Sequence, residues 1–481
     1  MSIVLALVLC GVGVIAPGLS RWRTGDFAGP AALIVATWSI AAGLFLLRML
    51  PYPAMPAQAA GALLLGVGSL LAGTLLAAPL SRRAAPRDWP VPNAGTWVVA
   101  FSLVGIAGTL WYVWEVQRLL GLHALLDNST RIRIALAGYE IPSRFLFLQF
   151  FCIIAPILAA GLWLGGTRFR AWQWSVVAAC IACTWITTDR TQFFIVVLAV
   201  LFMYLLRYGR SLSVTRSIAA VLVAGTALSA NFLAVGYWTG RSPENLGFAL
   251  SAPRASAAAA SRRQRVHTPG QPAVRMEDGA LEATDSSTLE AVSTSQNKLV
   301  AAVYRKTSTL YLYATGSFAA FALWFPPEGP PTYGLHCLYP VVRLFNRLGV
   351  LTWELPAPVL GFTKVVRRGN ASILFNGYTL LYYPISDFGV VGMVVYCLVL
   401  GLIVGITYER TRRVRTSSLH LLLMGQFSVA LVLSVFVNKF NSTMSWYLAV
   451  ATTAPFLVSA IAGAWRDRTG ATKPEADVAS R

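Results

Sequence analysis

The stretch Asn376-Gly-Tyr-Thr-Leu-Leu-Tyr-Tyr-Pro-Ile-Ser-Asp-Phe-Gly-Val-Val-Gly392 decides how the rest of the chain is interpreted. It closes a long polar segment, residues 237–387, and enters the apolar run 390–406 directly. On both sides of this segment the chain is a series of apolar runs of roughly bilayer-spanning length. The segment is therefore the one part with enough polar chain to build a site, and a site at its end would lie at the membrane surface.

The composition excludes an ordinary soluble globule. Of the 481 residues, 56% are hydrophobic and only 12% are charged, and the mean hydropathy is +0.62, which indicates an integral membrane protein with many spans. The net charge of +20 would suggest nucleic acid as the partner of a soluble protein. Here the arginines cluster between apolar runs, so they indicate membrane topology and no nucleic-acid partner is expected.

Eleven apolar runs are long enough to be candidate membrane helices. They are residues 3–17, 32–47, 59–80, 97–114, 145–164, 174–187, 193–206, 218–235, 390–406, 419–437 and 446–464. The sequence therefore predicts an all-α polytopic membrane protein of about eleven transmembrane helices. Eight lie in residues 1–236, one large loop (237–388) precedes the ninth, the last three lie in 389–465, and a tail follows at 466–481.

Positive residues in the short connections predict the orientation, because cytoplasmic loops of membrane proteins are rich in Lys and Arg. Alternate connections form a richer and a poorer set, and the richer set is expected in the cytoplasm. The N-terminus and the loop 237–388 are then periplasmic and the tail cytoplasmic. The richer set holds Arg21, Arg23, Arg82, Arg83, Arg87, Arg168, Arg170, Arg207, Arg210, Arg216, Arg410, Arg412, Arg413, Arg415, Arg466 and Arg468; the poorer set holds Arg48, Arg118, Arg131, Arg133, Arg144, Arg190 and Lys439.

The long loop divides by composition. Residues 241–296 are rich in Ala, Ser, Arg and Pro and are expected to be a flexible insert. Residues 298–388 are expected to form amphipathic or re-entrant helices. Within them, 298–325 is interpreted as a helix lying on the membrane or dipping into it, and 337–348 as a second short amphipathic helix.

Arginines on the predicted periplasmic side are candidates for a site, because the other positive residues are concentrated in the predicted cytoplasmic connections. Arg190 follows Asp189 in a tight hairpin between two apolar runs, where a charge is costly unless it is paired or solvated. One interpretation is an Asp189–Arg190 pair that caps the hairpin. The other is a guanidinium that binds phosphate through its planar fork. For Arg131, Arg133 and Arg241 the two alternatives are anchoring at the membrane surface and phosphate binding. Arg305 is expected to face lipid head groups.

Two further residues are candidates for acid–base chemistry. His336 is the histidine placed in the structured part of the long loop, and Asp387 stands at the entrance to the ninth span. Asp387 is interpreted either as the N-cap of the helix that begins near Gly389 or as a catalytic group. The outer loops contain no H-E-x-x-H or D-x-D motif, so neither a metal nor another cofactor is expected. Cys180 and Cys183 form a C-x-x-C pair that is interpreted as helix packing.

Several motifs together resemble the Wzy-type oligosaccharide repeat-unit polymerases, also called O-antigen polymerases. They are Asn376-Gly-Tyr-Thr, Tyr383-Pro-Ile-Ser-Asp-Phe-Gly-Val-Val-Gly, Gly401-Leu-Ile-Val-Gly and the hairpin Asp189-Arg190-Thr191. The layout is similar over most of the chain, while the motifs themselves cover only 187–192 and 371–408. The related O-antigen ligases carry a His before the Asn, where this chain has Phe375, and this difference argues against a ligase.

The resemblance implies a metal-independent membrane glycosyltransferase of GT-C type in the bacterial inner membrane. Donor and acceptor would be oligosaccharides on undecaprenyl pyrophosphate, polymerised at the periplasmic face into O-antigen, capsule or exopolysaccharide. Arg190 would stabilise the pyrophosphate leaving group, and Asp387 or His336 would act on the acceptor hydroxyl. Substrate-binding roles fall to Arg131, Arg133, Asp189, Arg241, Arg305, Asn376, Tyr378 and Tyr383, although the tyrosines, with Tyr382, are also interpreted as an interfacial belt.

Other functions stay open at this point. An O-antigen ligase or another GT-C transferase would use the same lipid-linked sugars. A polysaccharide flippase or transporter belongs to a different class, and such proteins often carry internal repeats or charges inside their spans. This sequence shows no clear repeat and hardly any charge inside a predicted span. A purely structural membrane protein is the third alternative. Besides the bilayer and the lipid-linked oligosaccharides, a chain-length regulator and a flippase are the expected partners.

Overall fold

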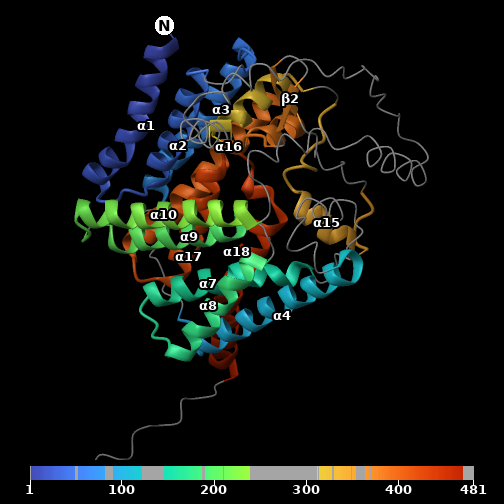
Figure 1. The fold of residues 1–481 in the computed structure, drawn as a ribbon. Helices are drawn as coiled ribbons and strands as arrows, with labels where there is room; N and C mark the ends of the chain where they lie inside the picture. The colour runs from blue at the N-terminus through green and yellow to red at the C-terminus, as the bar shows by residue number, and fades with distance from the viewer. Residues whose placement is uncertain are drawn as a thin grey trace, which may run out of the picture.

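The computed structural model describes residues 2–48, 52–81, 90–121, 146–186, 190–209, 211–238, 311–312, 314–327, 330–347, 349–353, 363–368, 371–375 and 377–469. These residues form a bundle of helices with one small hairpin (Figure 1). In chain order the elements are α1 (Ser2–Thr24), α2 (Pro30–Leu46), α3 (Ala57–Ser81), α4 (Ala94–Leu120), η1 (Leu146–Phe150), α7 (Phe151–Leu164), α8 (Ala171–Ile186), α9 (Arg190–Tyr208), α10 (Val214–Trp238), the helix Ala314–Trp324, α15 (Tyr339–Arg347), β1 (Thr363–Arg368), β2 (Ala371–Phe375), α16 (Tyr382–Arg413), α17 (Ser418–Leu433), η2 (Lys439–Asn441) and α18 (Thr443–Thr469).

The expected fold class, an α-helical polytopic membrane protein, is confirmed. Eight described helices are long and apolar enough to cross a bilayer, namely α1, α3, α4, Phe147–Leu164, α9, α10, α16 and α18. The other three predicted spans coincide with the shorter apolar helices α2, α8 and α17. Large apolar side chains cover the outside of these helices, as Val391 (78% exposed) and Leu64 (76% exposed) illustrate, and such a surface suits lipid rather than water.

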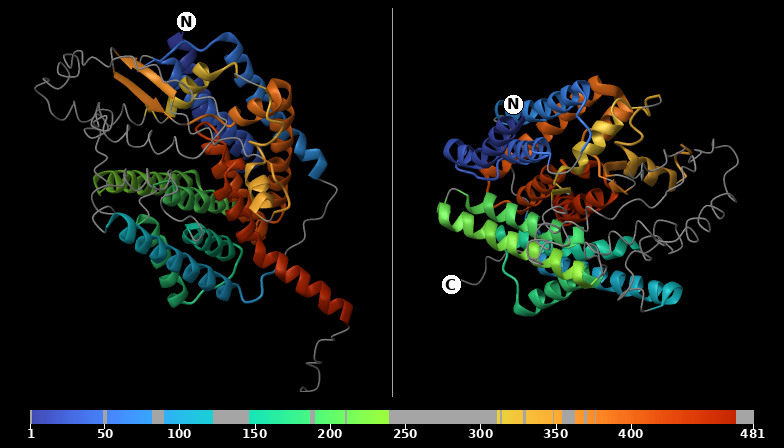
Figure 2. Two further views of the ribbon diagram at one scale, coloured as in Figure 1. Left: turned by 90° about the vertical axis from the view of Figure 1, so that its right-hand side faces the viewer. Right: turned by 45° about the horizontal axis from the view of Figure 1, so that its top comes forward.

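The helices form two groups with a third between them. α1, α2, α3 and α16 lie together on one side, and α4, α7, α8, α9 and α10 lie together on the other (Figure 1). α17 lies between the two groups, and α18 starts beside it and then extends out of the bundle (Figures 1 and 2). Helix α16 therefore packs on α3 at the outside of one group and on α17 toward the centre.

Glycines allow α3 and α16 to approach each other backbone to backbone. A Cβ atom added at Gly401 would overlap the carbonyl oxygen of Leu70, and one at Gly405 would lie 2.7 Å from the carbonyl oxygen of Thr74. Gly73 on α3 is equally close to the backbone of α16. Small residues at such spacing let membrane helices gain van der Waals contact where lipid offers no hydrophobic driving force between them.

Arginines tie several helix ends together at one end of the molecule, which we call the arginine-rich end. Because the last carbonyls of a helix have no partner within the helix, arginine donors stabilise them. The connections joined here all belong to the set that the sequence predicts to lie on one side. The donor–acceptor pairs are Arg21 Nη2 to Leu212 O (2.6 Å), Arg207 Nε to Leu164 O (2.9 Å), Arg413 Nη1 to Ser81 O (2.8 Å) and Arg415 Nη1 to Leu206 O (2.7 Å).

A buried ion pair lies at the centre of the arginine-rich end. Asp26, in the α1–α2 connection, is 1% exposed. Its carboxylate accepts hydrogen bonds from Arg415 Nη2 at 2.7 and 2.9 Å and from the Tyr408 hydroxyl at 3.0 Å. A buried carboxylate without such donors would be strongly destabilising, so the contact fixes the end of α16 against the α1–α2 connection.

The interpretation of 298–325 as a helix on the membrane surface is wrong for its described part. Phe318 is 3% exposed and its ring stacks on Phe45 and meets Trp38 edge to face, at 5.8 and 5.9 Å between centroids. The Tyr52 hydroxyl is 2.8 Å from Thr315 Oγ1. Alanines, a glycine and a serine lie between the aromatic residues of this helix. Several of its faces therefore carry only small side chains, and neighbouring helices can pack closely around it. The helix Ala314–Trp324 is packed against α2 within the bundle; a re-entrant position in the membrane stays a prediction.

The strands β1 and β2 are a second departure from the sequence interpretation. They pair antiparallel, with Arg368 opposite Ala371, where only helices and an approach to the ninth span were expected. The amphipathic helix predicted at 337–348 is present as α15.

We predict that Gly401→Leu separates α16 from α3, because the added side chain meets backbone that cannot rotate away. Overpacking of this kind costs about 1–3 kcal/mol, so the purified protein should unfold at a lower temperature in detergent. Gly68→Leu on α3 is the matched control, since a Cβ there meets nothing within 4 Å. Equal melting temperatures for the two variants would contradict the close packing.

Candidate functional site at the start of helix α16

The candidate site is built around a break near the start of α16. Gly389 has φ 68° and ψ −172°, which interrupts the helix between its first turns and the long run that follows. An L-residue is strained at this φ, so glycine suits the position. Ser386 and Asp387 lie immediately before the break, and their carbonyl oxygens accept from the backbone N–H groups of Thr332 (3.2 Å) and Tyr333 (3.1 Å).

The Asp387 carboxylate holds the segment 330–338 against this break. Asp387 is fully buried. Its carboxylate accepts from the Thr332 hydroxyl, from the His336 backbone N–H at 3.1 Å and from the Cys337 backbone N–H at 2.7 Å. We call this set of contacts the Asp387 clamp. Hydrogen bonds to a charged acceptor are about twice as strong as neutral ones, so the clamp fixes the position of His336.

The prediction that Asp387 is the N-cap of the helix beginning near Gly389 is wrong. The backbone N–H groups that it accepts from belong to the turn 333–338, which leads directly into α15. A carboxylate at the start of a helix satisfies free N–H groups and interacts favourably with the helix dipole. Asp387 therefore caps the approach to α15 from another part of the chain, and both of its carboxylate oxygens are engaged in doing so.

His336 lies beside the aromatic side chains at the start of α16. It is 8% exposed and its ring centroid is 5.6 Å from that of Tyr383. Burial lowers the pKa of the His336 imidazole, and the nearby Asp387 charge opposes this shift. An imidazole with a lowered pKa is mostly neutral at neutral pH.

The tyrosines of this region pack on one another and on Trp324 in tilted or edge-to-face arrangements. Tyr382 lies 4.4 Å from Tyr378, 5.2 Å from Tyr383 and 4.2 Å from Trp324, measured between ring centroids. Tyr378 is 8% exposed and Tyr382 is 4% exposed. The interpretation as interfacial belt residues is therefore wrong for these two. Tyr383, which is only half-buried, is the one of the three with surface to offer a sugar.

Arg190 is the first residue of α9, which runs from Arg190 to Tyr208. Two residues later Gln192 is 2% exposed, and its Oε1 has no hydrogen-bond partner in the described part of the chain. The N-terminus of a helix and a guanidinium group both attract anions. The other candidates for substrate binding, Arg131, Arg133, Asp189, Arg241, Arg305 and Asn376, lie outside the described residues.

Sequence reasoning missed two members of the clamp, Thr332 and Cys337. Thr332 follows Pro330-Pro331 and precedes a glycine and a short amphipathic run. This arrangement is typical of a residue at the start of a helix. The signal was present, but nothing in the local sequence connects Thr332 with Asp387, which is 55 residues away.

The comparisons with known proteins found no relative of this chain. No family model, no curated protein and no solved structure matches the chain.

We predict that Asp387→Asn releases the segment 330–338. An asparagine side chain has one acceptor oxygen and presents an NH₂ group to N–H donors, so at least one buried donor loses its partner at a cost of about 1–3 kcal/mol. The Cys337 thiol, which is 6% exposed, should then react with a maleimide roughly tenfold faster or more.

The control for this experiment is Ser386→Ala. The Ser386 hydroxyl donates to the Tyr382 carbonyl oxygen and takes no part in the clamp through its side chain. Mass spectrometry of the labelled peptide identifies the cysteine that reacts. A Cys337 thiol equally protected in Asp387→Asn and in the wild-type chain would show that the clamp does not hold the segment.

Proposed function

We propose that this chain polymerises lipid-linked oligosaccharide repeat units at the outer face of the bacterial cytoplasmic membrane. The donor is a glycan on undecaprenyl pyrophosphate and the acceptor is a second lipid-linked repeat. The observation that carries the proposal is the position of the candidate residues at the end of the bundle opposite the arginine-rich end.

The lengths of two helices separate these ends. α9 begins at Arg190 and contributes Leu206 and Arg207 to the arginine-rich end. Sixteen to seventeen residues of α-helix span roughly 25 Å, close to the thickness of the hydrocarbon core. α16 likewise has Asp387 near its start and Tyr408 and Arg413 at the arginine-rich end. By the positive-inside rule the arginine-rich end faces the cytoplasm, so Arg190 and the Asp387 clamp face outward.

The reaction requires charge stabilisation rather than a strong covalent catalyst. As the glycosidic bond breaks, negative charge develops on the departing lipid pyrophosphate. A guanidinium and the N-terminus of a helix are suited to that charge, because donors already in place need no reorganisation during the reaction. Arg190 combines both features and is our first assignment, with Arg131, Arg133 and Arg241 as further phosphate ligands.

The acceptor hydroxyl loses its proton as the new bond forms. Of the two candidates for a base, His336 fits better, since burial favours its neutral form. Asp387 has both oxygens engaged by Thr332, His336 and Cys337, so we assign it to positioning His336. The neighbouring Tyr383 is then placed to contact a sugar ring.

We predict that Arg190→Ala lowers polymer formation about a hundredfold or more, the typical cost of removing one donor to a developing anion. The measurement has two parts. Gel analysis of surface polysaccharide reports chain length in cells, and purified protein in detergent is assayed for elongation of lipid-linked oligosaccharide. A transporter would form no glycosidic bond in detergent, so the second assay separates the two classes.

Arg343→Ala is the matched control. Arg343 lies on α15, on the same side of the bundle, and its guanidinium is 6.0 Å from the Tyr339 ring centroid. Arg190→Lys, which keeps the charge but loses the planar fork, should fall between the wild-type chain and Arg190→Ala. Full-length polymer from an Arg190→Ala protein present at normal amounts would remove Arg190 from the mechanism.

A further inference from the structure

Three of the six cysteines of the chain come together where α4, α7 and α8 meet. Cys152 is the second residue of α7, and Cys180 and Cys183 lie about one turn apart on α8. Cys152 and Cys180 are fully buried in one small apolar cluster, and Cys183 packs against it. The Cys152 side chain is within hydrogen-bonding reach of both thiols of α8. The fold thus adds a third thiol to the C-x-x-C pair.

The two buried sulfur atoms are held against α4. Cys180 Sγ lies 3.7 Å from the carbonyl oxygen of Ser102 on α4 and 3.8 Å from that of Phe151, the residue before Cys152. A Cβ added at Gly105 on α4 would be 2.6 Å from the Cys152 nitrogen and 2.9 Å from its sulfur. Gly105 therefore leaves the space in which the Cys152 thiol reaches α8.

The proton of each buried thiol has an oxygen acceptor. The Thr109 hydroxyl donates to the Gly105 carbonyl oxygen at 3.0 Å and lies 3.4 Å from Cys152 Sγ. A hydroxyl has one proton, so the Cys152 S–H donates to Thr109 Oγ1, while the Cys180 S–H donates to a backbone carbonyl oxygen. The sulfur–sulfur contacts therefore do not depend on a shared proton, and each thiol has a group that orients it.

Cys183 is the member of the cluster that a reagent can reach. It is half-buried, whereas the other two thiols are fully buried. The exposed side chains that follow it on α8 are apolar, namely Trp185 (41%) and Ile186 (36%). A reagent that approaches Cys183 along this surface must therefore be soluble in lipid.

The depth of the cluster also favours a reagent dissolved in the membrane. Cys152 and Leu164 lie near opposite ends of α7, and the Leu164 carbonyl oxygen is bound at the arginine-rich end. The 14 residues of this helix span roughly 20 Å. The thiols are thus in the half of the bundle away from the arginine-rich end, between helices whose outer surfaces are apolar.

Two thiols in contact can be oxidised to a disulfide, whereas a single thiol in apolar surroundings is inert. The oxidation releases two electrons and two protons. A quinone accepts both pairs and leaves as the hydroquinone, so no further reactant is needed. The Cys183 sulfur adds to a carbonyl carbon of the quinone. The Cys152 sulfur then attacks the Cys183 sulfur, so that the S–S bond forms as the C–S bond breaks.

We propose that Cys152 and Cys183 form a redox-active dithiol that a membrane quinone converts into a disulfide between α7 and α8. The convergence of the thiols on α4, the half-buried position of Cys183 and its apolar approach carry the proposal. Cys180 packs beneath the pair and takes no part in the bond. The proposal does not rest on the polymerase assignment, because it concerns a group of helices and residues that the candidate reaction does not use.

The test treats the purified full-length chain, reduced and in lipid nanodiscs, with decylubiquinone. Free thiols are then blocked with N-ethylmaleimide, and the digest is analysed by mass spectrometry without reduction. The expected product is a peptide pair linked through Cys152 and Cys183, with one hydroquinone formed per disulfide. Cys397, which is fully buried on α16 outside the cluster, should be recovered as the free thiol or its maleimide adduct.

Three variants assign the bond. Cys152→Ser and Cys183→Ser should each abolish the linked peptide. Cys180→Ser is the matched control, because it changes a fully buried cysteine of the same cluster and should leave the link intact. Melting temperatures in nanodiscs check that each variant is folded. If Cys183→Ser unfolds, Cys183→Ala replaces it with the same readout.

Three results would overturn the proposal. One is a folded wild-type chain whose Cys152 and Cys183 remain thiols after quinone treatment. Another is a linked peptide that persists in Cys183→Ser, since a different thiol would then be the one that reacts. The third is equally fast linkage by ferricyanide, a water-soluble oxidant, because the route to Cys183 would then be aqueous.

Discussion

The pairing of charged side chains at the arginine-rich end is the constraint on which the rest of the structure depends. In an apolar bundle a guanidinium or carboxylate must find a partner. Here the partners are the last carbonyls of α3, α7 and α9 and the buried carboxylate of Asp26. Because the same arginines join connections far apart in the chain, they collect one set of helix ends in one place. The other ends, which carry the candidate site, are thereby directed the opposite way.

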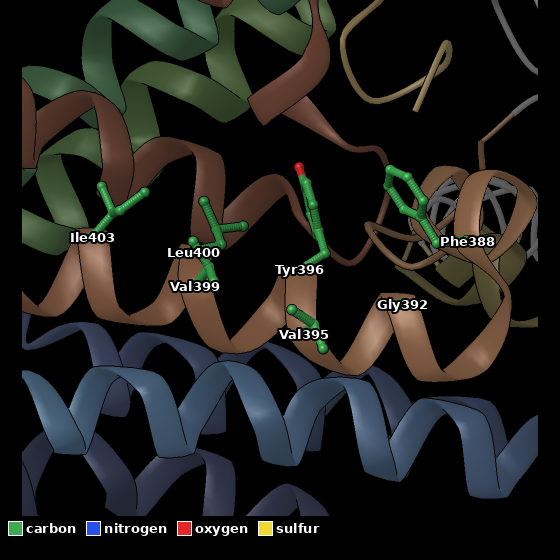
Figure 3. Close-up of a pocket in the computed structure, with 7 residues that line it drawn as sticks. All are labelled: Phe388, Gly392, Val395, Tyr396, Val399, Leu400 and Ile403. Atoms are coloured by element: carbon green, nitrogen blue, oxygen red, sulfur yellow. The ribbon is translucent and has the colours of Figure 1, made fainter. Parts of the chain in front are cut away.

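Helix α16 connects the separate features. Its end is held by Asp26 through Tyr408 and by Ser81 through Arg413, and its middle packs on α3 through glycines. The break at Gly389 turns the start of the helix so that Asp387 reaches the segment 330–338. Another face of α16, from Phe388 to Ile403, lines an apolar pocket of about 460 Å³ (Figure 3). One helix therefore carries the packing, the clamp and the lining of this pocket.

Most of the helical architecture could be predicted from the sequence, because apolar runs of sufficient length have one stable arrangement in a bilayer. The alternation of arginine-rich with arginine-poor connections also predicted which helix ends lie together. The partners of particular residues could not be predicted. Asp387 meets amides 50 and 51 residues away, and the helix Ala314–Trp324 is buried because Trp38 and Phe45 enclose Phe318. The sequence does contain a hairpin pattern, Gly369-Asn370 between two β-forming runs. The long apolar helices predicted around it favoured a helical interpretation of this segment. The roles of Arg190, Arg131, Arg133 and Arg241 remain predictions.

The measurement that tests the central claim most directly is the side of the membrane on which each end lies. Single cysteines introduced by Thr188→Cys, two residues before Arg190, and by Thr416→Cys, next to Arg415, in a cysteine-free chain can be labelled with a membrane-impermeant maleimide. A bundle with an outward-facing site predicts that Thr188→Cys is labelled from outside the cytoplasmic membrane, and that Thr416→Cys is labelled only after the membrane is opened. Labelling of both cysteines from the same side would contradict this arrangement and leave no route for Arg190 to a substrate at the outer face.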